Sequence, residues 1–181
     1  MFEYTEEDGI ALLNLARQSI SSHFNKEKPI VLEGKQFKQA RGVFVTITKL
    51  GELRGCIGFP YPNMPIQEAV IEAAKAAAFQ DPRFSPLHEK ELKEIKIEIS
   101  ILTYPQQIET KIKNIEIGKD GLMCEFIGYS GLLLPQVATE YNFSPIQFLE
   151  CLCQKAGIPK DSWQNSNFKL QKFQCQIFKE D

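Results

Sequence analysis

The sequence contains 181 residues, of which 43% are hydrophobic and 24% are charged. This size and composition are those of one ordinary globular domain and exclude a disordered chain. The formal net charge of −2 gives no bulk attraction for nucleic acid or acidic lipid, which leaves only a local basic patch open. Because no stretch of about 18 apolar residues is present, a membrane-spanning helix is not expected.

The N-terminus and the cysteines favour a cytoplasmic protein. Residues 1–8, MFEYTEED, are acidic where a secretory signal peptide needs basic residues followed by an apolar core. The cysteines are odd in number and irregularly spaced, so reduced thiols are expected rather than a disulfide framework. With His23 and His88 as the only histidines and no Cys-x-x-Cys pair, no metal site is expected. The five cysteines are Cys56, Cys124, Cys151, Cys153 and Cys175.

The first 60 residues predict a helix followed by a β-hairpin. Thr5 and Asp8 have the spacing of a capping box, and the apolar residues behind them repeat at helical spacing over residues 6–22. Residues 23–41 are polar and predict an irregular connection. Alternating β-branched and aromatic residues then predict a strand over 42–49, a turn at Leu50-Gly51 and a partner strand over 52–57.

The next segment predicts a second helix and a third strand. Asn63 is expected to cap a helix over residues 65–79, with Pro65 in its first turn. Five alanines among residues 73–78 leave little side-chain bulk, so another element can pack closely against this helix. Ser85-Pro86 predicts a short helical turn before Lys93, and the alternation of residues 95–101 predicts a half-buried strand. The buried stripe of the helix is expected to be Ile66, Ala69, Val70, Ala73 and Ala77.

The second half of the chain predicts further hairpins and two short helices. Residues 118–121, GKDG, are typical of a hairpin turn before a strand over 122–126. Pro135 and Ser144-Pro145 each begin a helix, the second ending at Gly157. A final strand over residues 168–177 changes its alternation once, which predicts a bulge near residues 171–172. Neighbouring hairpins with few helices indicate one α+β domain over residues 1–181, a mostly antiparallel sheet flanked by helices.

The first candidate site is the segment over residues 53–58, LRGCIG. Gly55 and Gly58 permit the close approach of a ligand or another backbone. Arg54 and Cys56 are two residues apart on a strand, so their side chains share a face, where a guanidinium can favour the thiolate. Cys56 is then a candidate nucleophile. The alternative is that Cys56 is a small core residue and that Arg54 binds backbone.

The second candidate site is the segment over residues 81–84, DPRF. The chain uses lysine 17 times and arginine four times, and Arg41, Arg54 and Arg83 each lie beside a glycine or a proline. Arginine in such places suggests planar, bidentate bonding to a carboxylate or phosphate. We expect Arg83 or Arg41 to lie within about 10 Å of Arg54, forming an anion site judged by bidentate arginine geometry. The alternative is a structural arginine that binds loop carbonyls or Asp81.

These segments resemble the AMMECR domain family, named after the human Alport syndrome, midface hypoplasia and elliptocytosis chromosomal region. The resemblance extends nearly from end to end and includes the six-residue hallmark at residues 53–58. One departure is the Cys151-Leu152-Cys153 sequence, where relatives are expected to have a single cysteine. The other matching segments are residues 42–46, 81–84, 97–103, 117–122, 131–138 and 155–157, and Trp163.

The resemblance implies a fold of two lobes, the larger one holding both termini, with the hallmark near the groove between them. It implies no established reaction and no cofactor. Prokaryotic relatives resemble one component of the three-part AmmeMemoRadiSam system, whose other components are a Memo-like protein and a radical S-adenosylmethionine enzyme. This chain lacks the cysteine triplet that would hold the cluster of that enzyme.

Three hypotheses follow for residues 53–58. The first is a cysteine-dependent enzyme or covalent carrier that uses Cys56. The second, which we favour because no general base is evident, is a binding module that holds a small anionic ligand or a partner peptide. Its ligand-binding residues would be Arg54, Gly55, Gly58, Arg83 and Arg41. The third is a purely structural role, with the strand packed under the alanine-rich helix.

Overall fold

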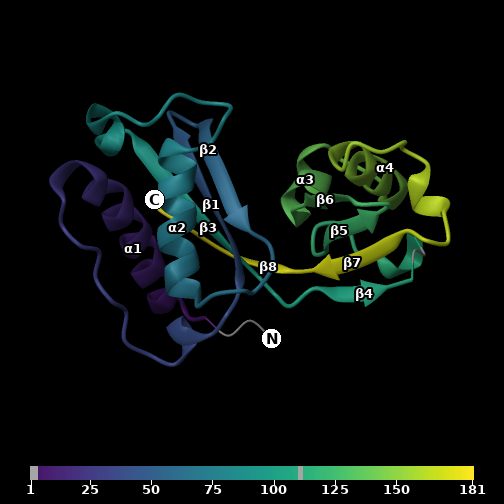
Figure 1. The fold of residues 1–181 in the computed structure, drawn as a ribbon, viewed down its shortest axis with the longest axis horizontal. Coiled ribbons are helices and arrows are strands. Elements are labelled where there is room, and N and C mark those ends of the chain that lie inside the picture. The colour runs from purple at the N-terminus through teal and green to yellow at the C-terminus, as the bar shows by residue number, and fades with distance from the viewer. Residues whose placement is uncertain (1–3, 110–111) are drawn as a thin grey trace. The chain divides into compact units, whose positions relative to one another are not determined.

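The computed structural model describes residues 4–109 and 112–181, in two compact units (Figure 1). Unit 1 contains Met1–Leu102 and Gln176–Asp181, and unit 2 contains Thr103–Cys175. Residues 1–3 of the acidic N-terminal segment lie outside the described residues. In the described ranges, no helix has the length and apolar character needed to cross a membrane.

Unit 1 is a four-stranded sheet with two helices over one face. The sheet has the order β2-β1-β3-β8, and β1 pairs antiparallel with both β2 and β3. Figure 1 shows the two helices α1 and α2 side by side over this sheet. The bounds are α1 Glu6–Asn25, β1 Gly42–Lys49, β2 Glu52–Phe59, α2 Ile66–Phe79, β3 Ile95–Leu102 and β8 Cys175–Lys179, with 3-10 turns at Gln36–Lys38 and Glu89–Lys93.

The two faces of this sheet differ in burial. Val43, Val45 and Ile47 of β1 are fully buried, and the isoleucines of β3 are at most 4% exposed. The intervening side chains of β1 are only half-buried. Because successive side chains alternate across a strand, the first set packs under α1 and α2, and Thr46 and Cys56 belong to the opposite face.

Local sequence accounts for most boundaries in unit 1. Thr5 and Asp8 form the expected capping box of α1. Leu50 and Gly51 both have positive φ, 52° and 85°, as a two-residue hairpin turn requires. The expected cap at Asn63 is wrong, because α2 begins at Ile66 with Pro65 as its N-cap. Instead, the Ile66 N–H donates to the carbonyl of Gln39, an acceptor distant in sequence.

Unit 2 has a second four-stranded antiparallel sheet and its own core. The sheet has the order β4-β7-β5-β6, and each neighbouring pair is antiparallel. Helix α4 supplies Phe148, Leu149 and Leu152, all fully buried, which pack with Leu122 of β5. The bounds are β4 Gln106–Ile108, β5 Gly121–Phe126, β6 Tyr129–Leu133, α3 Pro135–Glu140, α4 Pro145–Lys155 and β7 Lys169–Phe173, with 3-10 turns at Ile112–Asn114 and Ser162–Gln164.

The α+β fold with antiparallel sheets is confirmed, and two local predictions are corrected. Residues 118–121 do not close a hairpin; the buried carboxylate of Asp120 instead accepts hydrogen bonds from the Glu116 N–H and from Lys172 Nζ. The expected final strand is two strands, β7 and β8, which belong to different sheets. The change in alternation marks Gln174, where the chain passes from one sheet to the other, and is not a bulge.

Candidate functional site

The hallmark segment lies in β2, an edge strand whose outer backbone groups at Cys56 are bound by side chains. The Cys56 N–H donates to Asp81 Oδ2 at 2.9 Å, and Arg83 Nη2 donates to the Cys56 carbonyl at 3.3 Å. An edge strand presents unpaired N–H and C=O groups. Residues 81–84 therefore bind the edge of β2 at Cys56 in place of a neighbouring strand. The two candidate segments, residues 53–58 and 81–84, thus lie in contact.

Asp81 and Arg83 form a bidentate ion pair at this edge. The Nε and Nη2 atoms of Arg83 lie 3.0 and 2.7 Å from the two carboxylate oxygens of Asp81. Asp81 is only 4% exposed, whereas 52% of the Arg83 side chain is exposed. The hydrogen bond from Arg83 holds the pKa of Asp81 well below its usual range, assisted by the Cys56 and Arg83 backbone N–H groups. Asp81 is therefore ionised and fixed in place, which makes it unsuited to take up a proton at neutral pH.

Arg54 is more fully engaged than Arg83. Its Nε and Nη2 atoms lie 3.1 and 3.0 Å from the carboxylate of Glu91, and Nη1 donates to the Ser85 carbonyl at 2.9 Å. The Arg54 and Glu91 side chains are each 13% exposed. The hydrogen bond from Arg54 lowers the pKa of Glu91 to about 2, with further contributions from the His88 N–H and Lys49. Arg54 thus binds β2 to the segment that follows α2.

The hollow beside Arg54 carries balanced charge. Its walls include Lys49, Arg54 and Lys90, but also Glu89, Glu91 and Glu94. Lys49 itself is paired with Glu91 at 3.1 Å and with Glu94 at 2.8 Å. Three cations matched by three carboxylates produce no excess positive potential, so this hollow offers little attraction for a free anion.

The thiol of Cys56 is half-buried on the sheet face opposite the helices. Thr46, its cross-strand neighbour on β1, donates from Oγ1 to Cys56 Sγ at 3.3 Å. Among the described residues, neither histidine is hydrogen-bonded to the thiol: the His23 ring stacks on Phe79 with ring centroids 4.1 Å apart, and His88 forms a capping box with Glu91, to which its backbone N–H donates. The described hydrogen bonds of Cys56 thus include no general base.

Both glycines of the hallmark are required by close packing. A Cβ on Gly55 would lie 2.1 Å from the carbonyl oxygen of Ala77, so α2 rests directly on β2 at this point. A Cβ on Gly58 would lie 2.4 Å from the Phe44 ring and from the Val43 carbonyl oxygen. Neither glycine has a positive φ. The alanine-rich helix therefore occupies the space that Gly55 leaves, as the structural hypothesis expects.

Arg41 lies at the other end of the hairpin from Arg54. It precedes β1, and its guanidinium donates to the Ala40 carbonyl and to Gln39 Oε1. Arg54 lies opposite the register shift between Ile47 and Thr48. Six residues at about 3.3 Å each place these two backbone positions roughly 20 Å apart. Of the three arginines, Arg54 and Arg83 are brought to the same strand edge and Arg41 is not.

Sequence reasoning missed Glu91 and Thr46, the partners of Arg54 and Cys56. Glu91 lies 37 residues beyond Arg54 in a run of charged residues, which reads as a solvated surface. The turn at Leu50-Gly51 does not predict Thr46 either, because the register it sets would place Gly55 opposite position 46, and only the register shift between Ile47 and Thr48 brings Cys56 there. No local signal identifies Glu91.

The cysteines provide a prediction that tests the accessibility of the site. Burial raises the pKa of the Cys124 thiol to about 11 and also raises the pKa of Cys153, and both side chains are at most 2% exposed. Iodoacetamide at pH 7.5 should therefore modify Cys56 in the native protein and leave Cys124 and Cys153 unmodified. Peptide mass spectrometry measures each site, with urea-unfolded protein as the control in which all five react. An unmodified Cys56 would contradict its half-buried placement.

The class of protein is defined by its two antiparallel four-stranded sheets and by one local feature. Each sheet has its own helices, and the hallmark strand at residues 53–58 is bound by the DPRF turn at residues 81–84. The AMMECR1 family profile matches residues 13–178. The chain belongs to the AMMECR1 family, as the sequence resemblance indicated.

Similar proteins come from archaea. A protein of Methanothermobacter thermautotrophicus is 43% identical, covering 98% of this chain and 96% of its own length. Protein MJ0810 of Methanocaldococcus jannaschii is also 43% identical, with 97% and 92% covered. The crystal structure of the uncharacterized protein PH0010 from Pyrococcus horikoshii is similar with a TM-score of 0.92 and 39% identity, covering 99% of this chain and 95% of that one.

Proposed function

We propose that this chain is a cytoplasmic binding module that presents the edge of β2 at Cys56 and Arg83 to a partner peptide or a small anionic group. The proposal rests on the exposed, only partly bonded guanidinium of Arg83. Asp81 occupies its Nε and Nη2 atoms, but half of the side chain is exposed and Nη1 forms no hydrogen bond within the described residues. A guanidinium oriented by one carboxylate, with donors to spare, suits a second carboxylate or a phosphate.

The remaining site residues have supporting roles in this proposal. Arg54 holds the segment after α2 against β2, and Gly55 and Gly58 let α2 and Phe44 lie close to the strand. They shape the surface on which the Arg83 guanidinium is displayed. Arg41, at the far end of the hairpin, would contribute only to a ligand that extends along the strand.

We further propose that the two units act as a single AMMECR-type domain over residues 1–181. The family profile supports this, because its match over residues 13–178 includes most of both units. The proposed partners are a Memo-like protein and a radical S-adenosylmethionine enzyme, as the family resemblance implies.

The alternative function is a Cys56-dependent enzyme or covalent carrier. It is favoured by the Thr46 hydroxyl on the thiol and by Arg83, whose pKa is raised chiefly by its hydrogen bond to Asp81 and in smaller part by Cys56. A carrier needs a nucleophilic sulfur, whereas a binding module needs only the shape and the guanidinium. Substitution of Cys56 separates the two functions.

The experiment is a binding assay between the full chain and each of the two candidate partner proteins. Arg83→Lys should weaken binding at least tenfold, because lysine preserves the charge beside Asp81 but lacks the planar guanidinium with its paired N–H donors. Cys56→Ser should change the affinity less than twofold. Arg17→Lys is the matched control, since Arg17 forms a similar bidentate pair with Glu180 elsewhere in unit 1.

The outcomes distinguish the alternatives. Loss of binding in Cys56→Ser with retention in Arg83→Lys supports the cysteine-dependent function. Equal effects of Arg83→Lys and Arg17→Lys, or no binding of either protein by the wild type, contradict the binding module. Thermal unfolding of each variant shows whether the fold is intact.

A further inference from the structure

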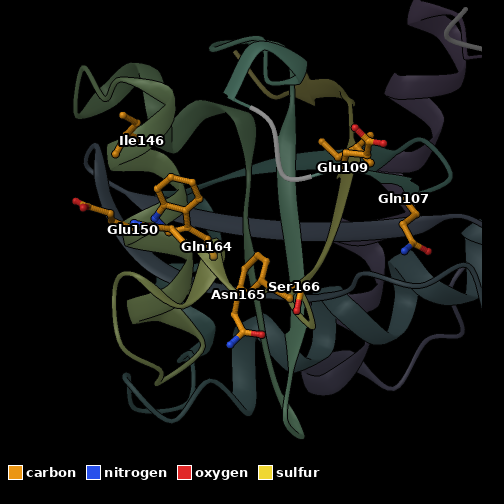
Figure 2. A pocket seen from close by; sticks show the side chains of 10 residues that line it. Gln107, Glu109, Ile146, Glu150, Gln164, Asn165 and Ser166 are labelled. Atoms are coloured by element: carbon orange, nitrogen blue, oxygen red, sulfur yellow. The ribbon is translucent and has the colours of Figure 1, made fainter.

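The open hollow of unit 2 does not gather polar groups at one point. It is bordered by β4, α4 and the 3-10 turn Ser162–Gln164. In Figure 2 its labelled polar side chains are spread around the hollow, with Gln107 and Glu150 on opposite sides. A ligand site needs polar groups that converge on one place, and such a place lies instead on the edge of β2 in unit 1.

One residue of the β2 edge, Gly58, has unpaired backbone groups. The Cys56 N–H donates to Asp81, so the backbone groups of Cys56 face away from β1. Two residues farther along the strand, the N–H and C=O of Gly58 face the same outer side. Gly58 is half-buried, and neither group has a partner within the described residues. The edge of β2 is therefore open to a further hydrogen-bonded residue at Gly58.

The open part of the edge is short because both of its ends are closed. On one side, Asp81 and Arg83 bind the N–H and the C=O of Cys56. On the other side, β2 ends at Phe59 and Pro60 has no N–H to donate. A long peptide strand paired with Gly58 would run into the turn at residues 81–84. A strand that ends beside Arg83 would not.

Arg83 and Gly58 are placed to hold one carboxylate together. Nε and Nη2 of Arg83 face Asp81, so Nη1, which has no hydrogen bond within the described residues, lies on the far side of the guanidinium. Asp81 binds the N–H of Cys56 and Arg83 binds its C=O, so this far side points along the strand toward Gly58. The Gly58 backbone lies about 7 Å beyond that of Cys56, at about 3.3 Å per residue. A carboxylate that accepts one hydrogen bond on each oxygen spans such a distance.

The direction of the pairing places a C-terminus at this point. In an antiparallel pair, the N–H of each residue donates to the C=O of the other. The carbonyl end of a residue paired with Gly58 therefore lies at the Gly58 N–H, on the side of Arg83. If that residue is the last of its chain, its carbonyl end is a carboxylate beside a guanidinium.

The side chain of such a residue would lie beside Phe44. Directly paired residues point their side chains to the same face of a sheet, and Phe44 is the cross-strand neighbour of Gly58 on β1. The half-buried Phe44 ring covers Gly58, since a Cβ there would lie 2.4 Å from it. An apolar terminal side chain can therefore pack against the edge of this ring.

We propose that the β2 edge at Gly58 binds the free C-terminus of a partner peptide whose last residue is apolar. The terminal carboxylate accepts hydrogen bonds from Arg83 Nη1 and the Gly58 N–H, and the last amide N–H donates to the Gly58 carbonyl oxygen. This inference rests on the proposed binding function and specifies the chemical group that the partner presents.

A short peptide tests the proposal directly. N-acetyl-Ala-Ala-Phe with a free carboxylate should bind the full-length protein with a dissociation constant of about 1 mM, since only a few hydrogen bonds form at an exposed edge. Amide NMR spectra measure the affinity, and the Gly58 resonance should be among those that shift most. The same peptide with a C-terminal amide should bind at least tenfold more weakly. N-methylation of the phenylalanine amide, or glycine in place of phenylalanine, should weaken binding at least threefold.

Variants test the guanidinium. Arg83→Lys should weaken the free-acid peptide at least fivefold, whereas Arg17→Lys, in the other bidentate pair, should leave its affinity unchanged. The amide spectrum of each variant shows whether its fold is intact. Equal binding of the acid and the amide, equal binding after N-methylation, or binding of acetate or inorganic phosphate as tight as that of the peptide would overturn the proposal.

Failure of this proposal is distinguishable from failure of the binding function. If Arg83→Lys weakens binding of a partner protein but removal of that partner's last residue does not, the binding function stands and the C-terminal inference is wrong. If removal of the last residue weakens binding as much as Arg83→Lys does, both are supported.

Discussion

Replacing Gly55 by alanine should lower the free energy of unfolding by about 3 kcal/mol, the upper part of the range for an overpacked core position. The added Cβ would lie 2.1 Å from the Ala77 carbonyl oxygen, so α2 must move away from β2. The clash involves a backbone atom of α2, which cannot rotate out of the way. Urea unfolding at pH 7 measures the loss.

Two further variants control this result. Gly51→Ala has no neighbouring atom within 4 Å and carries only the strain of its positive φ, so its loss should be about 1 kcal/mol. Ala77→Gly combined with Gly55→Ala should not restore stability, since the carbonyl oxygen remains. If Gly55→Ala and Gly51→Ala lose equal stability, close packing is not the reason for glycine at position 55.

Replacing Arg54 by methionine should cost roughly 2 kcal/mol at pH 7, because the mostly buried carboxylate of Glu91 then keeps only Lys49 and the His88 N–H as partners. The cost should depend on pH. The pKa of Glu91 is lowered from 4.5 to about 2 in the folded protein. The stability it contributes is fully present above pH 4.5, its unfolded value, and is lost as the pH falls toward 2. The difference between wild type and Arg54→Met should therefore shrink as the pH falls from 4.5 to about 2.

A double-mutant cycle separates the ion pair from the other contacts of Arg54. Arg54→Met combined with Glu91→Leu should lose less stability than the sum of the single losses, since neither partner remains unpaired. Additive losses would contradict a direct coupling. Arg17→Met is the comparison, because the side chains of the Arg17–Glu180 pair are 32% and 21% exposed and solvent weakens the interaction.

The local sequence was informative wherever neighbouring residues decide the structure. The capping box at Thr5, the turn at Leu50-Gly51 and the α4 cap at Ser144 are all present as expected. The buried stripe of α2 also agrees. Each of these features depends on contacts within a few residues or on the periodicity of one element.

The predictions that failed required an acceptor or a strand partner distant in sequence. Asn63 is a typical N-cap residue, but the first N–H of α2 donates instead to the carbonyl of Gln39. Asp120 has the character of a turn residue, but its carboxylate is buried and binds Lys172. The apparent single strand at the C-terminus was divided because its two halves find partners in different sheets.

The candidate site follows the same division. The sequence by itself identified the two segments, the scarcity of arginine and the family. Only the tertiary structure decided that Arg54 is held by Glu91 and two backbone carbonyls, that Asp81 binds the Cys56 N–H, and that Arg83 retains an exposed guanidinium. The physical reason is that propensity and periodicity act over a few residues, whereas ion pairing and edge-strand bonding are settled by which segments folding brings together.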